Sequence, residues 1–95
     1  MHMVLREGFR GHSVVVTMNE RRVYEAAGVT TDPLTARAAI FAVGAADRKA
    51  RVAVAVSPGD LAATFEVDVA VHPHVAISLV GGSTVAFETS AWPFR

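Results

Sequence analysis

Apolar and polar residues alternate with a period of two along much of this chain, and valine occupies most inner positions. A period of two sends successive side chains to opposite faces, which is the pattern of a β-strand with one buried face. The alternation is clearest in the segments 13–18, 51–56, 61–71, 75–80 and 84–90. Because β-branched valine packs well on a pleated surface, the pattern predicts an all-β fold.

The residues expected on the inner faces are the apolar members of each alternating segment. They are Val14, Val16, Met18, Val52, Val54, Val56, Phe65, Val67, Val69, Val71, Val75, Ile77, Leu79, Val85 and Phe87. Phe41 is a further core candidate from a segment whose structure the alternation does not settle.

Turn-forming residues separate the segments at regular intervals, as is typical of a β-sandwich or barrel. The turns are expected at Asn19-Glu20, Ser57-Pro58-Gly59-Asp60, His72-Pro73-His74 and Gly81-Gly82. The first of them reads as a two-residue hairpin loop that leads into a further strand at 21–26. Asn tolerates the left-handed conformation that such a loop requires, whereas Glu in the second position is a poor choice.

The segment 33–46 permits two interpretations. Asp32 and Pro33 are favoured at the N-cap and first position of a helix, and an Ala-rich stretch follows them. The residues Ile-Phe-Ala-Val at 40–43 favour a strand over 35–43 instead. With the strand, which we prefer, the fold is an immunoglobulin-like β-sandwich of about seven antiparallel strands. With the helix at 33–46, the fold is α+β.

Composition restricts the class of protein. The chain has 95 residues, enough for one domain spanning 1–95, and 52% are hydrophobic, which excludes a disordered chain. Nine basic residues balance nine acidic ones, which argues against a nucleic-acid partner because such proteins carry a basic excess. The absence of cysteine excludes disulfides and thiolate metal sites.

Nothing in the sequence predicts membrane insertion. The most apolar window, 36–46, is shorter than the ~20 residues of a transmembrane helix and contains Arg37. Residues 1–7 lack the apolar core of a signal peptide. We therefore expect a cytoplasmic location, or a secreted or periplasmic one if a leader has been removed. The frequent Ala, Val and Arg are typical of a high-GC bacterial coding sequence.

The common enzyme motifs, GxSxG, GxxxxGK[ST], HExxH and GxGxxG, do not occur in the sequence. Catalysis needs an acid, base or nucleophile held in a pocket, and the candidates are His12, His72, His74, Glu66 and Asp68. Glu66 and Asp68 share the solvent face of a predicted strand, where they read as ordinary solvated charges. We therefore expect a non-enzymatic protein without a cofactor, with an active site at a subunit interface as the alternative.

His72-Pro73-His74 is the strongest metal-binding candidate in the sequence. Two imidazoles that flank a rigid proline can bind Zn²⁺ or Cu²⁺ if a third ligand, such as His12, approaches them. The alternative is a turn with two exposed histidines, in which Pro73 only ends one strand and redirects the next.

Small apolar residues occupy outer strand positions where a solvated sheet would be polar, as at Val15, Ala53 and Ala55. Such a flat surface allows close approach of another protein, and a net charge of zero offers little repulsion between copies. Near the C-terminus, Trp92 and Phe94 either fold back onto the core or contact a partner. These five residues form the predicted interface, with a second copy or another protein as the partner.

Three successive stretches of the chain carry a resemblance to a known class of domain: S-V-V-V-T-M-N-E-R-R-V-Y-E, then S-P-G-D, then F-E-V-D-V-A-V. Their arrangement resembles the small immunoglobulin-like or transthyretin-like β-sandwiches that serve as accessory domains in many bacterial proteins. The resemblance covers about residues 11–90 and lies in pattern and turn spacing. The Cys…Trp…Cys arrangement of true immunoglobulin domains is missing. The resemblance implies a binding, structural or self-assembling module, and it transfers no functional residue.

Overall fold

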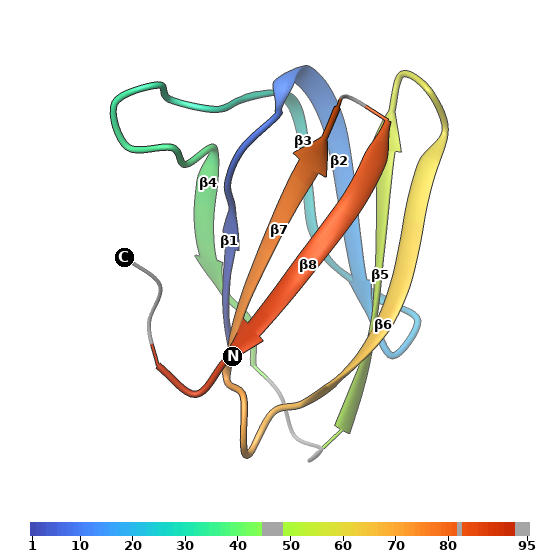
Figure 1. Cartoon of the computed structure of the whole chain (residues 1–95). Coiled ribbons are helices and arrows are strands. Elements are labelled where there is room, and N and C mark those ends of the chain that lie inside the picture. The colour runs from blue at the N-terminus through green and yellow to red at the C-terminus, as the bar shows by residue number, and fades with distance from the viewer. Residues whose placement is uncertain (45–48, 82, 93–95) are drawn as a thin grey trace.

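Two four-stranded sheets pack face to face in the computed structural model, which describes residues 1–44, 49–81 and 83–92 (Figure 1). The strands are β1 (His2–Leu5), β2 (Arg10–Met18), β3 (Arg21–Thr30), β4 (Ala39–Ala42), β5 (Lys49–Ser57), β6 (Leu61–Asp68), β7 (His74–Val80) and β8 (Thr84–Ser90). The β1 sheet has the order β4-β1-β7-β8, and the β2 sheet has the order β3-β2-β5-β6. The predicted all-β sandwich is confirmed.

The structure differs from seven antiparallel strands in two respects. The described residues form eight strands, and the β1–β7 pair is parallel whereas the other pairs are antiparallel. The additional strand, β1, contains the continuous apolar run Met3, Val4 and Leu5, in which all three residues are buried. Periodicity does not identify such a short run as a strand, because it has no alternation.

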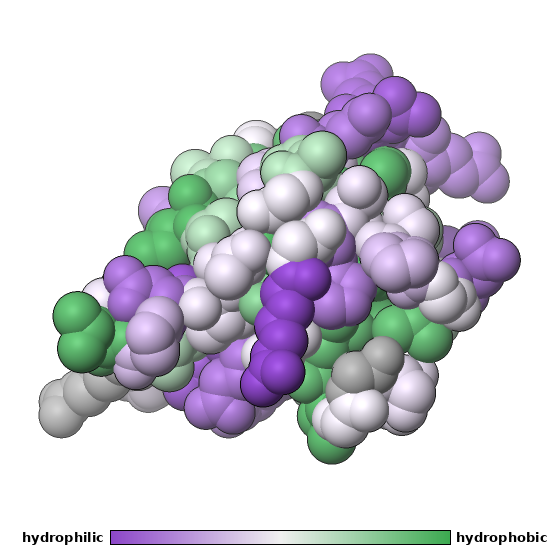
Figure 2. Space-filling model, turned by 90° about the horizontal axis from the view of Figure 1, so that it is seen from above, coloured by the Kyte–Doolittle hydropathy of each residue, from purple (hydrophilic) through white to green (hydrophobic). Residues whose placement is uncertain are grey.

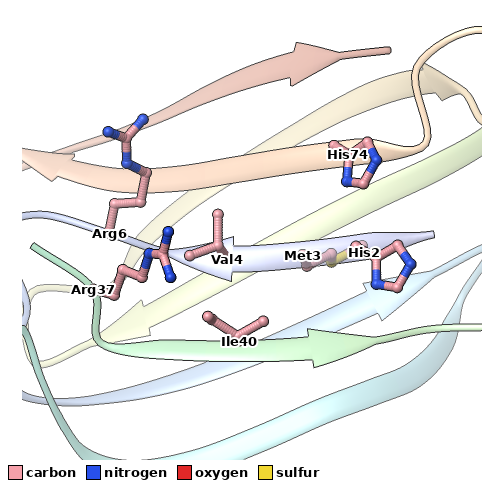
Figure 3. Close-up of a pocket in the computed structure, with 7 residues that line it drawn as sticks. All are labelled: His2, Met3, Val4, Arg6, Arg37, Ile40 and His74. Atoms are coloured by element: carbon pink, nitrogen blue, oxygen red, sulfur yellow. The ribbon is translucent and has the colours of Figure 1, made fainter. Parts of the chain in front are cut away.

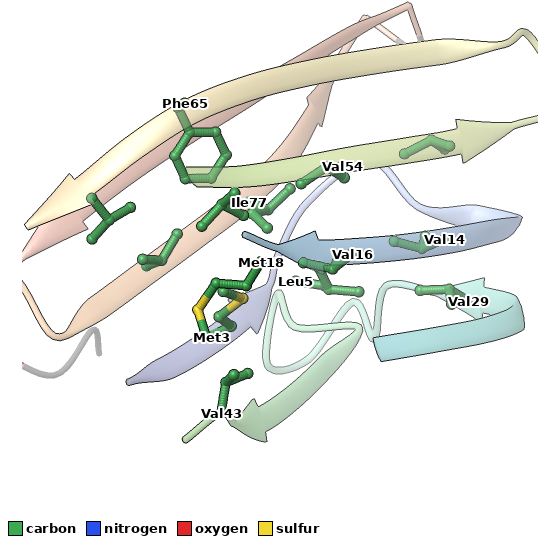
Figure 4. Packing of buried hydrophobic residues seen from close by; sticks show 14 of the residues in the cluster. Met3, Leu5, Val14, Val16, Met18, Val29, Val43, Val54, Phe65 and Ile77 are labelled. Atoms are coloured by element: carbon green, nitrogen blue, oxygen red, sulfur yellow. The ribbon is translucent and has the colours of Figure 1, made fainter. Parts of the chain in front are cut away.

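Alternation predicts the inner faces of the central strands correctly. In β2 and β5, Val14 lies opposite Val56 and Val16 lies opposite Val54, and all four are buried. Figure 4 shows Val14, Val16 and Val54 between the two layers, together with Leu5 and Ile77 of the β1 sheet. The most deeply buried side chains are Phe9, Met3, Leu5, Ile77, Val14, Val16, Val52, Val54, Val56, Val67 and Val75.

The predicted two-residue hairpin between β2 and β3 is confirmed. Asn19 and Glu20 both have positive φ, 52° and 68°, as a tight primed turn requires. Asn19 also donates its N–H to the carbonyl of Arg51 (2.8 Å), and its Oδ1 accepts the Arg51 N–H (2.9 Å). The turn is thereby joined to β5 as well as to the two strands it connects.

The helix expected as an alternative at 33–46 is wrong for the described part of that segment, which ends at residue 44. Asp32 does cap a turn, because its Oδ1 accepts the Leu34 N–H and its carbonyl accepts the Ala36 N–H, both at 2.8 Å. Ala36 then takes a φ of 56°, and Arg37 returns to an antiparallel bridge with Asp32. The predicted strand is confirmed, but it begins at Ala39 and not at residue 35.

The segment predicted as a strand over 61–71 ends early, at Asp68. The Asp68 carboxylate accepts the Ala70 N–H (3.2 Å), and its carbonyl accepts the N–H groups of Val71 (3.1 Å) and His72 (2.7 Å). Aspartate commonly forms such turns with its own backbone. Val71, which was expected in the core, is 53% exposed as a result.

Two aromatic stacks close the open sides of the sandwich. Tyr24 of β3 stacks on Phe41 of β4 with ring centroids 4.2 Å apart, and Phe65 of β6 stacks on Phe87 of β8 at 3.9 Å. Phe41 is half-buried and Phe87 is exposed on one side. Phe41 and Phe87 were expected within the core. They lie instead at its two edges, where one sheet meets the other.

The connection between β1 and β2 passes very close to β7. Leu79 donates its N–H to the Glu7 carbonyl (2.8 Å), and the next residue, Gly8, has a φ of 92°. A Cβ atom on Gly8 would overlap the carbonyl oxygen of Leu79. Only glycine satisfies both the positive φ and the close approach. Seen from above, at this end of the sandwich, hydrophobic residues lie in separate groups among hydrophilic ones (Figure 2).

Candidate functional site

A cleft lies on the outer face of the β1 sheet (Figure 3). We call it the β1 cleft; its lining residues are His2, Met3, Val4, Arg6, Arg37, Ile40 and His74. Its volume of ≈ 310 Å³ falls at the lower end of the range for small-molecule sites, which is about 300–1,000 Å³.

The middle of the β1 cleft is apolar. Val4 is only 7% exposed although it points to the outer face of the sheet. Its neighbour on β4, Ile40, is 61% exposed and borders the cleft. Its neighbour on β7, Ala76, is also buried, at 3% exposed. The middle of the cleft therefore combines two buried apolar residues, Val4 and Ala76, with one exposed apolar residue, Ile40.

Arg6 is held at one end of the cleft by its backbone. It follows β1 directly, and its N–H donates to the Ile77 carbonyl (2.8 Å). Its carbonyl accepts a hydrogen bond from the Thr31 hydroxyl (2.6 Å). The main chain at Arg6 is thus attached to β7 and to the segment after β3, and this attachment fixes where its side chain begins.

Arg37 reaches the same end from the turn between β3 and β4. Its carbonyl accepts the Asp32 N–H (2.8 Å), and the N–H of the following residue, Ala38, donates to the Leu5 carbonyl (2.6 Å). The turn therefore places Arg37 beside the end of β1, and Figure 3 shows the side chains of Arg6 and Arg37 at the same end of the cleft. A carboxylate oxygen of Glu88 lies 3.9 Å from Nη1 of Arg6.

Two histidines lie at the opposite end of the cleft. His2 of β1 and His74 of β7 are direct neighbours in the parallel register. Their rings are stacked with centroids 5.3 Å apart and an interplanar angle of 13°. The His2 N–H donates to the Pro73 carbonyl (2.8 Å), so the two strands are joined at the position of the pair.

The cleft thus combines three chemical environments in a line. Two guanidinium groups lie at one end, an apolar stretch containing Val4 and Ile40 lies in the middle, and two imidazoles lie at the other end. Arg6 follows directly after β1, so it lies four residues from His2 along the chain, a distance of about 13 Å in extended backbone. This arrangement suits an elongated ligand with an anionic end and an apolar body.

The structure places the three predicted metal ligands in different surroundings. His72 lies in the turn before β7, whereas His12 lies on β2, with Nδ1 accepting the Arg10 N–H (2.8 Å) and its ring edge-on to Phe9. His74 lies against His2. Among the described residues, no group of three or more metal-binding side chains is present. Metal binding by His72, His74 and His12 stays a prediction.

His2, Arg6, Arg37 and Ile40 line the cleft, but the sequence did not predict that they lie together. No local motif contains them, because they come from β1, the turn after β3, and β4. His2 is brought to His74 by the pairing of two strands that are distant in the chain. A signal for such a site would have required knowledge of which strands are neighbours.

The predicted interface residues divide between two places. Val15 pairs with Ala55 on the outer face of the β2 sheet, and Ala53 pairs with Thr17 on the same face. Trp92 is 77% exposed, so the expectation that it folds back onto the core is wrong. Phe94 lies outside the described residues.

The acidic residues considered for catalysis do not line the β1 cleft. Glu66 is exposed on β6 opposite Arg51, and the half-buried Asp68 caps the turn after β6. Glu66 borders a second hollow of ≈ 360 Å³ beside the Asn19-Glu20 hairpin, which is lined mainly by charged and polar side chains. Both carboxylates therefore have ordinary structural surroundings.

No family model, curated protein or solved structure matches this chain. Within the described residues, no helix is long and apolar enough to cross a membrane. Function must therefore be inferred from the chain's own residues.

Proposed function

We propose that this protein is a non-enzymatic binding module and that its β1 cleft binds a small carboxylic acid with an apolar body. The observation that carries the proposal is the position of Arg6 and Arg37 at one end of an apolar floor that contains Val4 and Ile40. The proposal agrees with the resemblance to bacterial β-sandwich accessory domains, which likewise implies binding without catalysis.

Charge and shape favour this ligand class. A guanidinium presents several N–H donors in a plane and binds a carboxylate through two parallel hydrogen bonds. Arg6 Nη1 lies 3.9 Å from a carboxylate oxygen of Glu88, so a ligand carboxylate would share this guanidinium with Glu88. The ligand's apolar body would cover the exposed side of Ile40, at about 25 cal/mol per Å² of apolar surface removed from water, while Val4 is already nearly buried.

Octanoate is a suitable probe because it combines a carboxylate with an unbranched apolar chain. In a titration followed by amide NMR shifts, we expect saturable changes at Val4, Ile40 and Ala76, with a Kd of about 1 mM or lower. Octanol, which lacks the charge, should bind at least about tenfold more weakly, because a hydrogen bond to a charged group contributes ~1.5–3 kcal/mol.

A charge-matched pair of variants identifies the cationic end. Arg37→Gln should weaken octanoate binding about tenfold or more, whereas Lys49→Gln, which removes one positive charge on the β2 sheet, should leave it unchanged. Thermal unfolding of both variants checks that the fold is intact. Equal binding of octanol and octanoate, or shifts confined to the β2 sheet, would rule out the proposed site.

Self-association through the outer face of the β2 sheet is a second candidate function. The observation that favours it is a row of small side chains across three strands, in which Ala55 lies between Val15 and Ala62. The proposed partner is a second copy, because a chain of zero net charge has little repulsion from itself. Trp92 and Phe94 remain proposed contact residues for a protein partner.

Light scattering during size-exclusion chromatography tests self-association. The wild-type chain should show a mass above 10.0 kDa that rises with concentration. Ala55→Lys should return it to the monomer mass, whereas Ser83→Lys, in the turn between β7 and β8, should not. A wild-type mass of 10.0 kDa at every concentration would reject the self-assembling function without affecting the cleft proposal.

A further inference from the structure

His2 and His74 place two imidazole rings, each a possible metal ligand, side by side on the β1 sheet. They occupy paired positions of the parallel strands β1 and β7, and their rings stack with centroids 5.3 Å apart. The His2 N–H is bonded to the Pro73 carbonyl at 2.8 Å, so the backbone fixes the spacing of the two Cα positions. Chelation by this pair would therefore require rotation of side chains and little movement of the backbone.

We infer that His2 and His74 form a two-imidazole binding site for a divalent transition cation, Zn²⁺ or Cu²⁺. Imidazole nitrogen is a preferred ligand of both ions, and their remaining coordination positions can be filled by water. Both rings line the β1 cleft, so those positions would face its open volume (Figure 3). The site goes beyond the proposed carboxylate binding, because its ligands lie at the opposite end of the cleft from Arg6 and Arg37.

The surroundings of the pair are compatible with this role. The two imidazole rings contact each other by stacking. His2 is exposed and His74 is half-buried, so an ion has access from solvent. Ser90 of β8 lies next to His74 in the register.

Titration calorimetry with ZnCl₂ alone tests the site, at about pH 7.5 because metal binding requires neutral imidazoles. We expect one saturable event for the wild-type chain. His2→Gln and His74→Gln should each weaken it at least about tenfold, because even loss of a residue that only supports a ligand costs 10–100-fold. His72→Gln and His12→Gln serve as controls and should bind as the wild type does.

The variants separate the competing sites. Zn²⁺ binding that survives His74→Gln but is lost in His2→Gln would overturn the inference and assign the ion to His2 with the terminal amino group of Met1. Binding lost in His72→Gln or His12→Gln would overturn it in favour of the set predicted from sequence. Absence of any heat of binding, or of Cu²⁺-induced broadening of the His2 and His74 ring signals, would also overturn it. None of these results bears on octanoate binding, which is measured without metal.

Discussion

The rings of Phe65 and Phe87 stack face to face across the two sheets, with centroids 3.9 Å apart and an interplanar angle of 7°. Phe87 lies opposite Ile77 in the β7–β8 register, so it starts from the inner face of the β1 sheet. Phe87 is 48% exposed, whereas Phe65 is only 5% exposed. Phe87 therefore acts as a cover for Phe65 at the edge where β6 and β8 meet.

Phe87→Ala should destabilise the fold by about 1–3 kcal/mol, less than a fully buried Phe→Ala because half of the ring is already in water. The change would expose Phe65 and remove the ring stack. Chemical unfolding monitored by circular dichroism measures the difference in the free energy of unfolding.

Trp92→Ala is the control for Phe87→Ala. It removes a larger aromatic ring, but one that is 77% exposed, so the free energy of unfolding should change by less than about 0.5 kcal/mol. If the two substitutions had equal effects, the stack would contribute nothing specific to stability.

Gly8→Ala should destabilise the protein by roughly 2–4 kcal/mol, because both the positive φ and the contact with Leu79 oppose a side chain. Gly28→Ala separates the two causes. Gly28 also has a positive φ, 67°, but nothing lies within 4 Å of the position of a Cβ. It should cost only about 1 kcal/mol. Comparison of the two melting temperatures measures the steric part, and similar values would contradict the close approach.

Glu20→Gly should stabilise the β2–β3 hairpin by about 0.5–1 kcal/mol. Glu20 has a φ of 68°, which costs a non-glycine residue ~1–2 kcal/mol, partly offset by the greater freedom of glycine in the unfolded chain. Equilibrium unfolding in urea measures the change. Asp60→Gly provides a comparison at another non-glycine residue of positive φ, 48°, in the turn between β5 and β6. A loss of stability in Glu20→Gly would contradict the expected strain.

Glu25→Gln should change stability by less than about 0.5 kcal/mol, although the Glu25 carboxylate lies 2.6 Å from Arg22. Both side chains are more than half exposed, and water and salt screen such a pair. Urea unfolding at low and high salt should give nearly the same difference between variant and wild type. A loss well above this value would show that the pair is shielded from solvent.

The parts of the fold that follow from local chemistry could be predicted. Valine alternation identified the buried faces of β2 and β5, because the side-chain period of a strand is a property of the backbone alone. Asn19-Glu20 identified a hairpin because a two-residue loop leaves few backbone conformations. Asp32 and Pro33 indicated a helix start, but the same residues also favour a turn, and the left-handed φ of Ala36 ends that turn before a helix forms.

The β1 cleft could not be predicted from the alternation and the turn residues. The alternation of apolar and polar residues predicts which side chains are buried, but it does not predict which strands are neighbours in a sheet. The parallel pairing of β1 with β7 places His2 beside His74, and the hydrogen bond from Ala38 to Leu5 brings Arg37 to the end of β1. These contacts join segments far apart in the chain, and they form because burial of the apolar faces selects one packing of the two sheets. The local sequence thus specified strands and turns, while the assembly of imidazoles and guanidiniums around Val4 arose from how those strands pack together.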